Sequence, residues 1–368
     1  MTAFATFVAS NLRSERFTLV DVGCSGGLES VWRLFADRFR AVGIDASAEE
    51  CRRLAAEEKH PDVHYVAAFA GIDPAHPLAA IADGVPVTRD IYPRTSASWM
   101  MELRRQKLQD APLQERLQHN AWQLTGLADP ATPIIVPDLL ELMGFSDVDL
   151  LKVDIDILDF MVLNSFDGRF DAMGLLAARL EVNLFGGPGD MINTFNNTDR
   201  FMRTRGFDLI ALDTRNYSMR APPARFEITT PAQTRSGRIF QGDAFYVRDL
   251  ASPESADIAA KVSDEKLAKL AVIFSIWNQP DGAAELLLAF RNRLSAIFDV
   301  DAALDLLAAQ AQPGNEQPLS YRNYMARFEA DSADFYPRPW TPPPPITLKR
   351  RIAAALRAFR DPNNPPQV

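Results

Sequence analysis

The feature that most constrains the fold is a regular alternation of apolar runs and amphipathic segments over residues 18–68. The runs TLVDVG, RAVGID and DVHYVAAFA have the near-continuous apolar character of strands in a parallel sheet. The first intervening segment places apolar residues at helical spacing: Leu28, Val31, Trp32 and Phe35. Ser47 and Glu50 form a capping box that begins the second. The alternation predicts parallel strands joined by crossover helices.

Four more apolar runs follow an irregular stretch: DVDLLKVDID, GLLAARLEVNLF, FDLIALD and RIFQGDAFYVRDL. The last two are expected to form an antiparallel terminal pair. The sequence therefore predicts an α/β fold, a Rossmann-like, seven-stranded, mostly parallel sheet with helices on both faces. The segment 71–133 is interpreted as an insertion into this domain, of the kind that carries substrate contacts or a lid.

Strand patterns end near residue 250, so we expect the sheet domain to span 1–250. Helical patterns then predict a C-terminal appendage over 251–336. Six of the nine residues in 337–345 are proline, which indicates an extended linker, and 337–368 forms the third expected region.

The tail after this linker, residues 346–368, carries five basic residues against one acidic residue. Its residues 346–360 combine one apolar helical face with clustered basic side chains, as in helices that lie on anionic membranes. The alternative is that the tail docks on the acidic body of the same chain or on a second subunit in a homo-oligomer. Both interpretations stay open.

Composition narrows the classes of partner. The net charge of −9 and a pI near 5.1 argue against a nucleic-acid partner, because phosphate binding needs clustered cations. The two cysteines and four histidines lack zinc-site spacing. No secretory leader or membrane-spanning run is recognised, so we expect a cytoplasmic protein, with possible contact between the tail and the inner face of the membrane.

The turn DVGCSGG, which follows the first strand, predicts a cofactor site. A dinucleotide fingerprint needs glycine where Ser25 and Leu28 stand. An acid followed by small residues at alternate positions instead fits S-adenosylmethionine, since glycine lets the backbone approach a ligand. A purely structural turn is the alternative. The predicted contacts in this turn are Asp21, Gly23, Cys24, Ser25 and Gly27.

Asp45 supports nucleoside binding, because it ends the second strand twenty-two residues after Gly23. A carboxylate there can accept both ribose hydroxyls, although NAD sites share this feature. Ala46, Ala68 and Phe69 complete the predicted cofactor contacts.

The chain contains, in this order, the segments LVDVGCSGG, VGIDAS, RTSAS, VPDLLELMGFSDVDLLKVDIDILDFMVLNSF, RLEVNLF, FMRTRGFDLIAL and GDAFYVR. They occur in the same order in the FkbM-like methyltransferases, which the chain resembles over about residues 17–250. That family is a branch of the class I S-adenosylmethionine-dependent enzymes. Its lysine and acids correspond to Lys152, Asp154, Asp156 and Asp159, whereas Ile157 replaces the usual glycine. The resemblance implies O-methylation, commonly of a saccharide hydroxyl.

Removal of the hydroxyl proton favours a general base, and Asp154 is the first candidate because it ends the fourth strand. Asp156 is the second, although it could cap a helix, and His119 in the insertion is the third. The acids could alternatively hold Mg²⁺, which is not favoured. Acceptor contacts are predicted at Arg94, Ser96, Ser98, Glu181 and Asn183. The competing hypotheses are a noncatalytic scaffold with this fold and a dinucleotide-dependent oxidoreductase.

Overall fold

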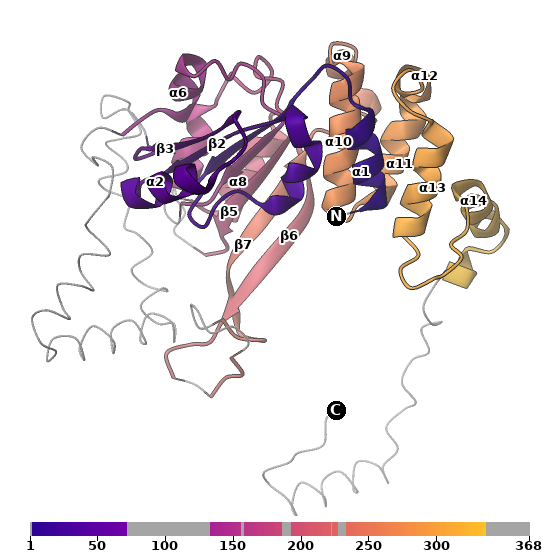
Figure 1. Ribbon diagram of the computed structural model, residues 1–368. Coiled ribbons are helices and arrows are strands. Elements are labelled where there is room, and N and C mark those ends of the chain that lie inside the picture. Colours follow the sequence, from indigo (N-terminus) through magenta and orange to yellow (C-terminus); the bar gives the residue numbers. More distant parts are fainter. Residues whose placement is uncertain are drawn as a thin grey trace, which may run out of the picture. The chain divides into compact units, whose positions relative to one another are not determined.

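The computed structural model describes residues 2–71, 133–155, 158–185, 193–221, 223–226 and 233–335. Its centre is one seven-stranded sheet (Figure 1). The strands are β1 Phe17–Val22, β2 Phe39–Asp45, β3 Val63–Ala67, β4 Leu150–Val153, β5 Ala177–Asn183, β6 Asp208–Tyr217 and β7 Arg238–Val247.

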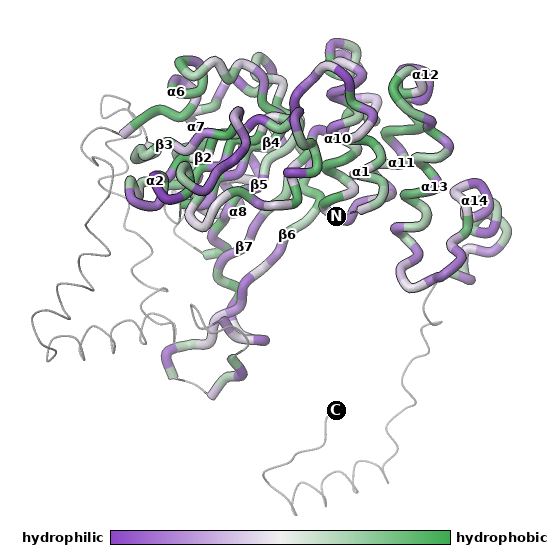
Figure 2. Tube along the Cα trace, in the orientation of Figure 1, coloured by the Kyte–Doolittle hydropathy of each residue, from purple (hydrophilic) through white to green (hydrophobic). Residues whose placement is uncertain are grey.

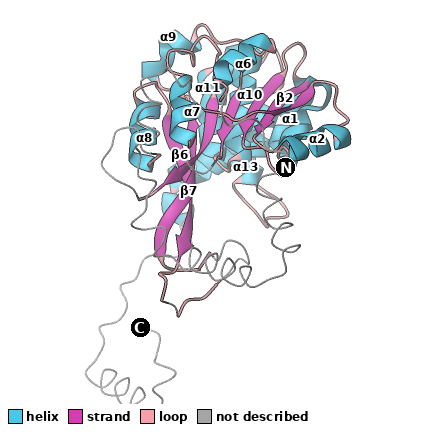
Figure 3. Ribbon diagram, turned by 90° about the vertical axis from the view of Figure 1, so that its left-hand side faces the viewer, coloured by secondary structure: helices cyan, strands magenta, loops and turns pink. Residues whose placement is uncertain are grey.

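The strand order is β3-β2-β1-β4-β5-β7-β6, with β7 antiparallel to both of its neighbours and the other pairs parallel. The order reverses between β1 and β4, where a doubly wound sheet opens a crevice beyond the carboxyl ends of its strands. This architecture confirms the predicted fold class and the antiparallel terminal pair. In both side views, β6 and β7 extend beyond the rest of the sheet (Figures 1 and 3).

One face of the sheet is packed against α6 Val136–Leu142, α7 Asp159–Ser165 and α8 Phe195–Arg203. Alternate strand residues point into this core, because successive side chains of a strand face opposite sides of the sheet. Towards the carboxyl ends of four strands they are apolar: Val20 and Val22, Val42 and Ile44, Leu151 and Val153, Ala178, Leu180 and Val182. This half of the face is therefore hydrophobic core.

The opposite face is covered at its amino-terminal half by helices from both ends of the chain. They are α1 Ala3–Asn11, η1 Ser30–Arg38, α10 Asp264–Ile276, α11 Pro280–Ala289 and α13 Val300–Gln310. Their apolar residues share one buried core with Leu19, Leu150 and Val247 of the sheet. Green segments along α10, α11 and α13 show this apolar character (Figure 2).

Helices α10, α11 and α13 therefore belong to the same core as the sheet, and one compact unit runs over Met1–Tyr321. Leu267, Leu270 and Phe274 of α10 are buried and share a core with apolar residues of the sheet and of α1. A division at 250 does not separate two cores. The second unit, Arg322–Val368, contains most of α14 Tyr321–Ala330 and η4 Ser332–Phe335, in which Phe335 packs on Tyr324 and Phe328.

The first crossover differs from the expected α-helix, because η1 is a 3₁₀ helix interrupted at Ala36, whose φ is 47°. Trp32 and Phe35 both stack on Phe17, with ring centroids 5.2 and 4.2 Å away. Residues three apart eclipse each other in a 3₁₀ helix, which brings both rings over the same strand residue. Packing against Phe17 thus accounts for the tighter winding. The remaining helices are α2 Ala48–Glu57, η3 Pro253–Ser255, α9 Ala256–Ala259 and α12 Arg291–Leu294.

Candidate functional site

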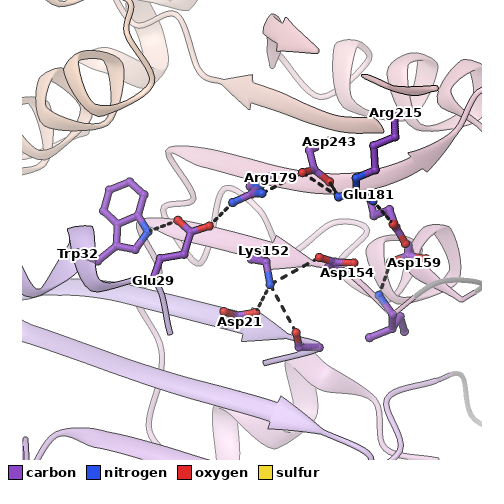
Figure 4. A network of polar contacts seen from close by, with 12 residues as sticks. Asp21, Glu29, Trp32, Lys152, Asp154, Asp159, Arg179, Glu181, Arg215 and Asp243 are labelled. Atoms are coloured by element: carbon purple, nitrogen blue, oxygen red, sulfur yellow. Dashed lines mark hydrogen bonds and ion pairs between the residues drawn. The ribbon is translucent and has the colours of Figure 1, made fainter. Parts of the chain in front are cut away.

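The predicted cofactor residues meet at the carboxyl ends of β2, β1 and β4 (Figure 4 shows the β1 and β4 part). Gly23 begins the turn after β1 with φ 89°, and a Cβ there would lie 1.9 Å from the carbonyl oxygen of Asp154. Gly26 and Gly27 also have positive φ. Only glycine fits the first position, because both the backbone conformation and the contact with β4 exclude a side chain.

Most backbone N–H groups of the turn already have acceptors. Those of Gly23 and Cys24 donate to the carbonyl of Ile44, and that of Gly27 donates to the carbonyl of Cys24. Glu50 of α2 accepts from the N–H of Gly26 at 2.9 Å. Hydrogen bonds to β2 and α2 therefore hold the turn in shape. The helix that follows the turn is the 3₁₀ helix η1, which begins only at Ser30.

Asp21 lies beneath the turn and is 1% exposed. Its Oδ1 accepts from the Lys152 ammonium at 3.0 Å, and Lys152 also reaches the carbonyl of Gly23 at 3.4 Å. Burial raises the pKa of Asp21 to about 6, and the ion pair with Lys152 only partly opposes this. Lys152 therefore already occupies Oδ1 of Asp21, a residue that the sequence predicts as a cofactor contact.

Asp45 ends β2 and is partly exposed. Its Oδ1 accepts from the N–H of Ser47 at 2.7 Å, which fixes the carboxylate at the carboxyl end of β2. Among the described residues, no group donates to Oδ2, so this oxygen is available to a ligand hydroxyl. Ala68 follows β3 and donates its N–H to the Asp45 carbonyl at 2.9 Å, which places it and Phe69 beside Asp45. Ala46 adjoins them in the chain.

Cys24 is buried inside the turn, and Ser25 is exposed on its surface. The Cys24 sulfur covers Gly43 of β2, where a Cβ would lie 2.8 Å from it. Cys24 therefore acts as a small packing residue between the turn and β2.

Asp154 follows β4 directly, and its side chain is 35% exposed. Its N–H donates to the carbonyl of Val22 at 2.9 Å, and its Oδ2 lies 3.8 Å from the Lys152 ammonium. Asp154 thus stands beside the glycine turn with its carboxylate open to solvent. The other two candidate bases, Asp156 and His119, lie outside the described residues, as do Arg94, Ser96 and Ser98.

Five charged side chains form a row across the loop after β1 and the strands β5, β7 and β6, which we call the charged ladder (Figure 4). Its members, in spatial order, are Glu29, Arg179, Asp243, Arg215 and Glu181. The two arginines bridge the three carboxylates. Asn183, at the end of β5, is partly exposed near Glu181 in sequence.

Sequence reasoning placed Glu181 at the crevice but missed the other members of the ladder. A signal was present in the run AARLEVN, where Arg179 and Glu181 interrupt a strand that is otherwise largely apolar. Residues two apart in a strand share one face. Such charges on a central strand indicate that this face is polar at its carboxyl end.

Asp159 at the start of α7 is 2% exposed. Its two oxygens accept from the Ile155 N–H at 2.7 Å and from the Asn193 amide at 2.9 Å. Burial raises the pKa of Asp159 well above its usual range. Asp159 therefore anchors the segment that follows Asp154.

A second charged cluster lies at the opposite, amino-terminal end of the sheet. Asp149 and Lys269 are both 0% exposed, with their charged groups 3.0 Å apart. Asp149 also accepts from the N–H of Thr18 at 2.8 Å, and Lys266 lies 3.2 Å away. A cavity of about 390 Å³ adjoins this cluster, remote from the glycine turn.

Comparisons with known proteins give no match to any family model and no match among curated proteins. Solved structures do match. Three are a precorrin-6y C5,15-methyltransferase from Geobacter metallireducens, a TehB-like SAM-dependent methyltransferase from Corynebacterium glutamicum and a SAM-dependent methyltransferase from Aquifex aeolicus. Each is 9% identical to this chain.

The matches cover 66%, 67% and 67% of this chain and 86%, 87% and 90% of the respective structures, with TM-scores of 0.29, 0.26 and 0.28. At TM-scores of this size, a functional assignment depends on the topology and side chains of the chain itself. In the described ranges, no group of histidine, cysteine or acidic residues is arranged to hold a metal ion. No helix in those ranges combines the length and apolarity needed to cross a membrane.

Proposed function

We propose that the chain is an S-adenosylmethionine-dependent O-methyltransferase of the FkbM-like kind, acting on a hydroxyl group of a saccharide. One observation carries the proposal: the tight glycine turn after β1 lies between Asp45, which ends β2, and Asp154, which follows β4. The three features stand side by side at the switch point of the sheet, where ligands of doubly wound folds bind.

The side chains at this position suit the proposed cofactor. The Oδ2 atom of Asp45 can accept from ribose hydroxyls, because Ser47 occupies only Oδ1. Gly26 has open space where a Cβ would stand, so the outer part of the turn can be approached closely. Partly exposed carboxylates at Glu29 and Asp154 complement the positive sulfonium.

The bound cofactor would supply an electrophilic methyl group on its sulfonium. In the proposed reaction, Asp154 accepts the proton of the acceptor hydroxyl, for which its half-open carboxylate is suited. Lys152, anchored on Asp21, limits the rotation of Asp154 by attraction at 3.8 Å. A positioned base contributes about 10²–10⁴-fold in rate, and orientation of the hydroxyl contributes more.

Calorimetric titration of the full chain with S-adenosylhomocysteine and with NAD tests the cofactor assignment. We expect binding of the first, and loss of that binding in Asp45→Ala. A matched control is Asp62→Ala, a partly exposed acid on the β3 side whose carboxylate pairs with Arg16. Binding of NAD alone would support an oxidoreductase, and binding of neither would favour a scaffold.

Transfer itself is tested by incubating the protein with methyl-labelled S-adenosylmethionine and a carbohydrate extract, followed by mass spectrometry of the sugars. A label on a sugar oxygen supports the proposal. A label on nitrogen or carbon would replace O-methylation by another methyl transfer.

A further inference from the structure

Both arginines of the charged ladder are already paired with carboxylates of the same chain. Both terminal nitrogens of Arg179 are engaged, one by Glu29 and the other by Asp243 at 2.8 Å. Arg215 is engaged in the same way, by Glu181 at 2.7 Å and by Asp243 at 2.9 and 3.1 Å. Arginine is usually the residue that recognises carboxylate or phosphate groups of ligands. Here the chain's own carboxylates occupy that role.

Each guanidinium keeps further N–H donors, but its charge is already compensated by two carboxylates, so an anionic ligand gains the full attraction of either arginine only by displacing one of them. Asp243 and Glu181 are 7% and 4% exposed, so neither can turn out to water when it loses its partner. A buried carboxylate without its cation is strongly disfavoured. The ladder therefore resists the entry of a competing anion.

The overall charge around the ladder also disfavours an anionic ligand. Among the described residues, the ladder and the Lys152 ion pairs together hold five carboxylates, of Asp21, Glu29, Asp154, Glu181 and Asp243, against three cations, of Lys152, Arg179 and Arg215. The count leaves a net charge of −2. With about 8 Å of screening length at physiological salt, this excess repels an anion that approaches Asp154.

Hydroxyl groups meet no such resistance. A carboxylate oxygen accepts more than one hydrogen bond, so a hydroxyl can donate to Glu29 or Asp154 without displacing an arginine. Both side chains are accessible, with 40% and 35% exposure.

From this arrangement we infer that the acceptor carries no anionic group where it enters the site, and that its class is a non-acidic polyhydroxy compound, such as a neutral saccharide unit, rather than a uronic acid, a sialic acid or a sugar phosphate. The inference rests on the proposed function and narrows its substrate. Asp243 is the specificity residue, because it holds both arginines at once.

The test uses the full chain, methyl-labelled S-adenosylmethionine and a carbohydrate extract of the cells that make the protein. After transfer, the carbohydrate is hydrolysed to monosaccharides, and anion exchange separates neutral and basic sugars from acidic ones. We expect at least ten times more label in the unretained fraction. A label that is mainly on acidic sugars overturns the inference and leaves the proposed function in place.

Asp243→Asn sharpens the test, because it keeps the shape of the side chain but releases its charge from both arginines. We expect the preference against acidic sugars to fall at least tenfold. Asp208→Asn is the matched control, an exposed acid at the far end of β6 whose loss leaves the ladder intact. An unchanged preference in a folded Asp243→Asn protein overturns the role of the ladder. No label on any sugar overturns the proposed function and the inference together.

Discussion

The two ends of the same sheet carry charged clusters with opposite characters. At the amino-terminal end, Asp149 and Lys269 are completely buried and join β4 to α10. At the carboxyl end, Lys152 and Asp154 have side-chain exposures of 16% and 35%. Both clusters pair lysine with aspartate on or beside β4, but Asp149 is completely buried whereas Asp154 is open to solvent.

The difference teaches that charge alone does not mark a functional site. The buried pair fixes the position of α10, because a lysine and an aspartate out of water stay ionised only when paired. The open cluster sits instead where the strand order reverses and a glycine turn approaches β4. A candidate functional cluster therefore differs from a structural one in two ways: one of its charged partners is exposed, and a glycine turn lies beside it.

The largest effect that we expect is on catalysis at the open end. Asp154→Asn removes the proposed base and should lower kcat by about 10²–10⁴-fold. Because its side chain is 35% exposed, the free energy of unfolding should change by less than about 0.5 kcal/mol. Methyl-transfer rates and urea unfolding measure the two quantities.

Asp138→Asn, an exposed acid paired with Arg169, serves as the control and should leave kcat unchanged. An Asp154→Asn enzyme with full activity would transfer the role of base to another group.

The second prediction concerns the buried end. Lys269→Met removes the closest cation of Asp149, which keeps only Lys266 at 3.2 Å, and should lower the free energy of unfolding by about 1–3 kcal/mol. Adding Asp149→Asn should restore part of this loss, since the incompletely compensated charge is then gone. Urea unfolding of the single and double variants checks both statements. A loss below about 1 kcal/mol would show that the buried pair does not hold α10.

A third prediction compares two glycines within one turn. Gly23→Ala should destabilise the fold by about 3–4 kcal/mol, because its Cβ would collide with β4 in addition to the positive φ. Gly26→Ala has a similar φ but open space around it, so only about 1–2 kcal/mol is expected. Thermal unfolding measures the difference. Equal losses would mean that the turn does not rest against Asp154.

The fourth prediction concerns a dependence of stability on pH. The pKa of Asp21 is about 6 in the folded chain against 3.8 for a free side chain, so the folded state binds more protons between these values. Stability from this group is therefore complete below about pH 4 and is lost as pH rises through 6. The loss is roughly 3 kcal/mol at most, from about 1.4 kcal/mol per pKa unit.

Asp21→Asn should remove this slope while other titrating groups keep theirs. Urea unfolding of both proteins from pH 4 to pH 8 isolates the contribution as a difference. Parallel curves would place the proton uptake elsewhere.

Much of the sheet was predictable from the sequence, because buried parallel strands appear as short apolar runs and their order follows from the crossovers. The proximity of Asp45, Gly23 and Asp154 was also predictable, since the carboxyl ends of parallel strands meet at one edge of the sheet. The winding of η1 was not, because it depends on where the ring of Phe17 stands. The burial of Asp159 was equally hidden, since its partners are the Ile155 backbone and the distant Asn193.

The sequence by itself determined the α/β class, the glycine turn and the acids at the strand ends, because these follow from local periodicity and residue type. Only the tertiary structure decided that α10, α11 and α13 share the core of the sheet, and that Arg179, Asp243 and Arg215 form a ladder across three strands. Contacts between residues far apart in the chain depend on strand register and side-chain direction, which a linear pattern does not contain.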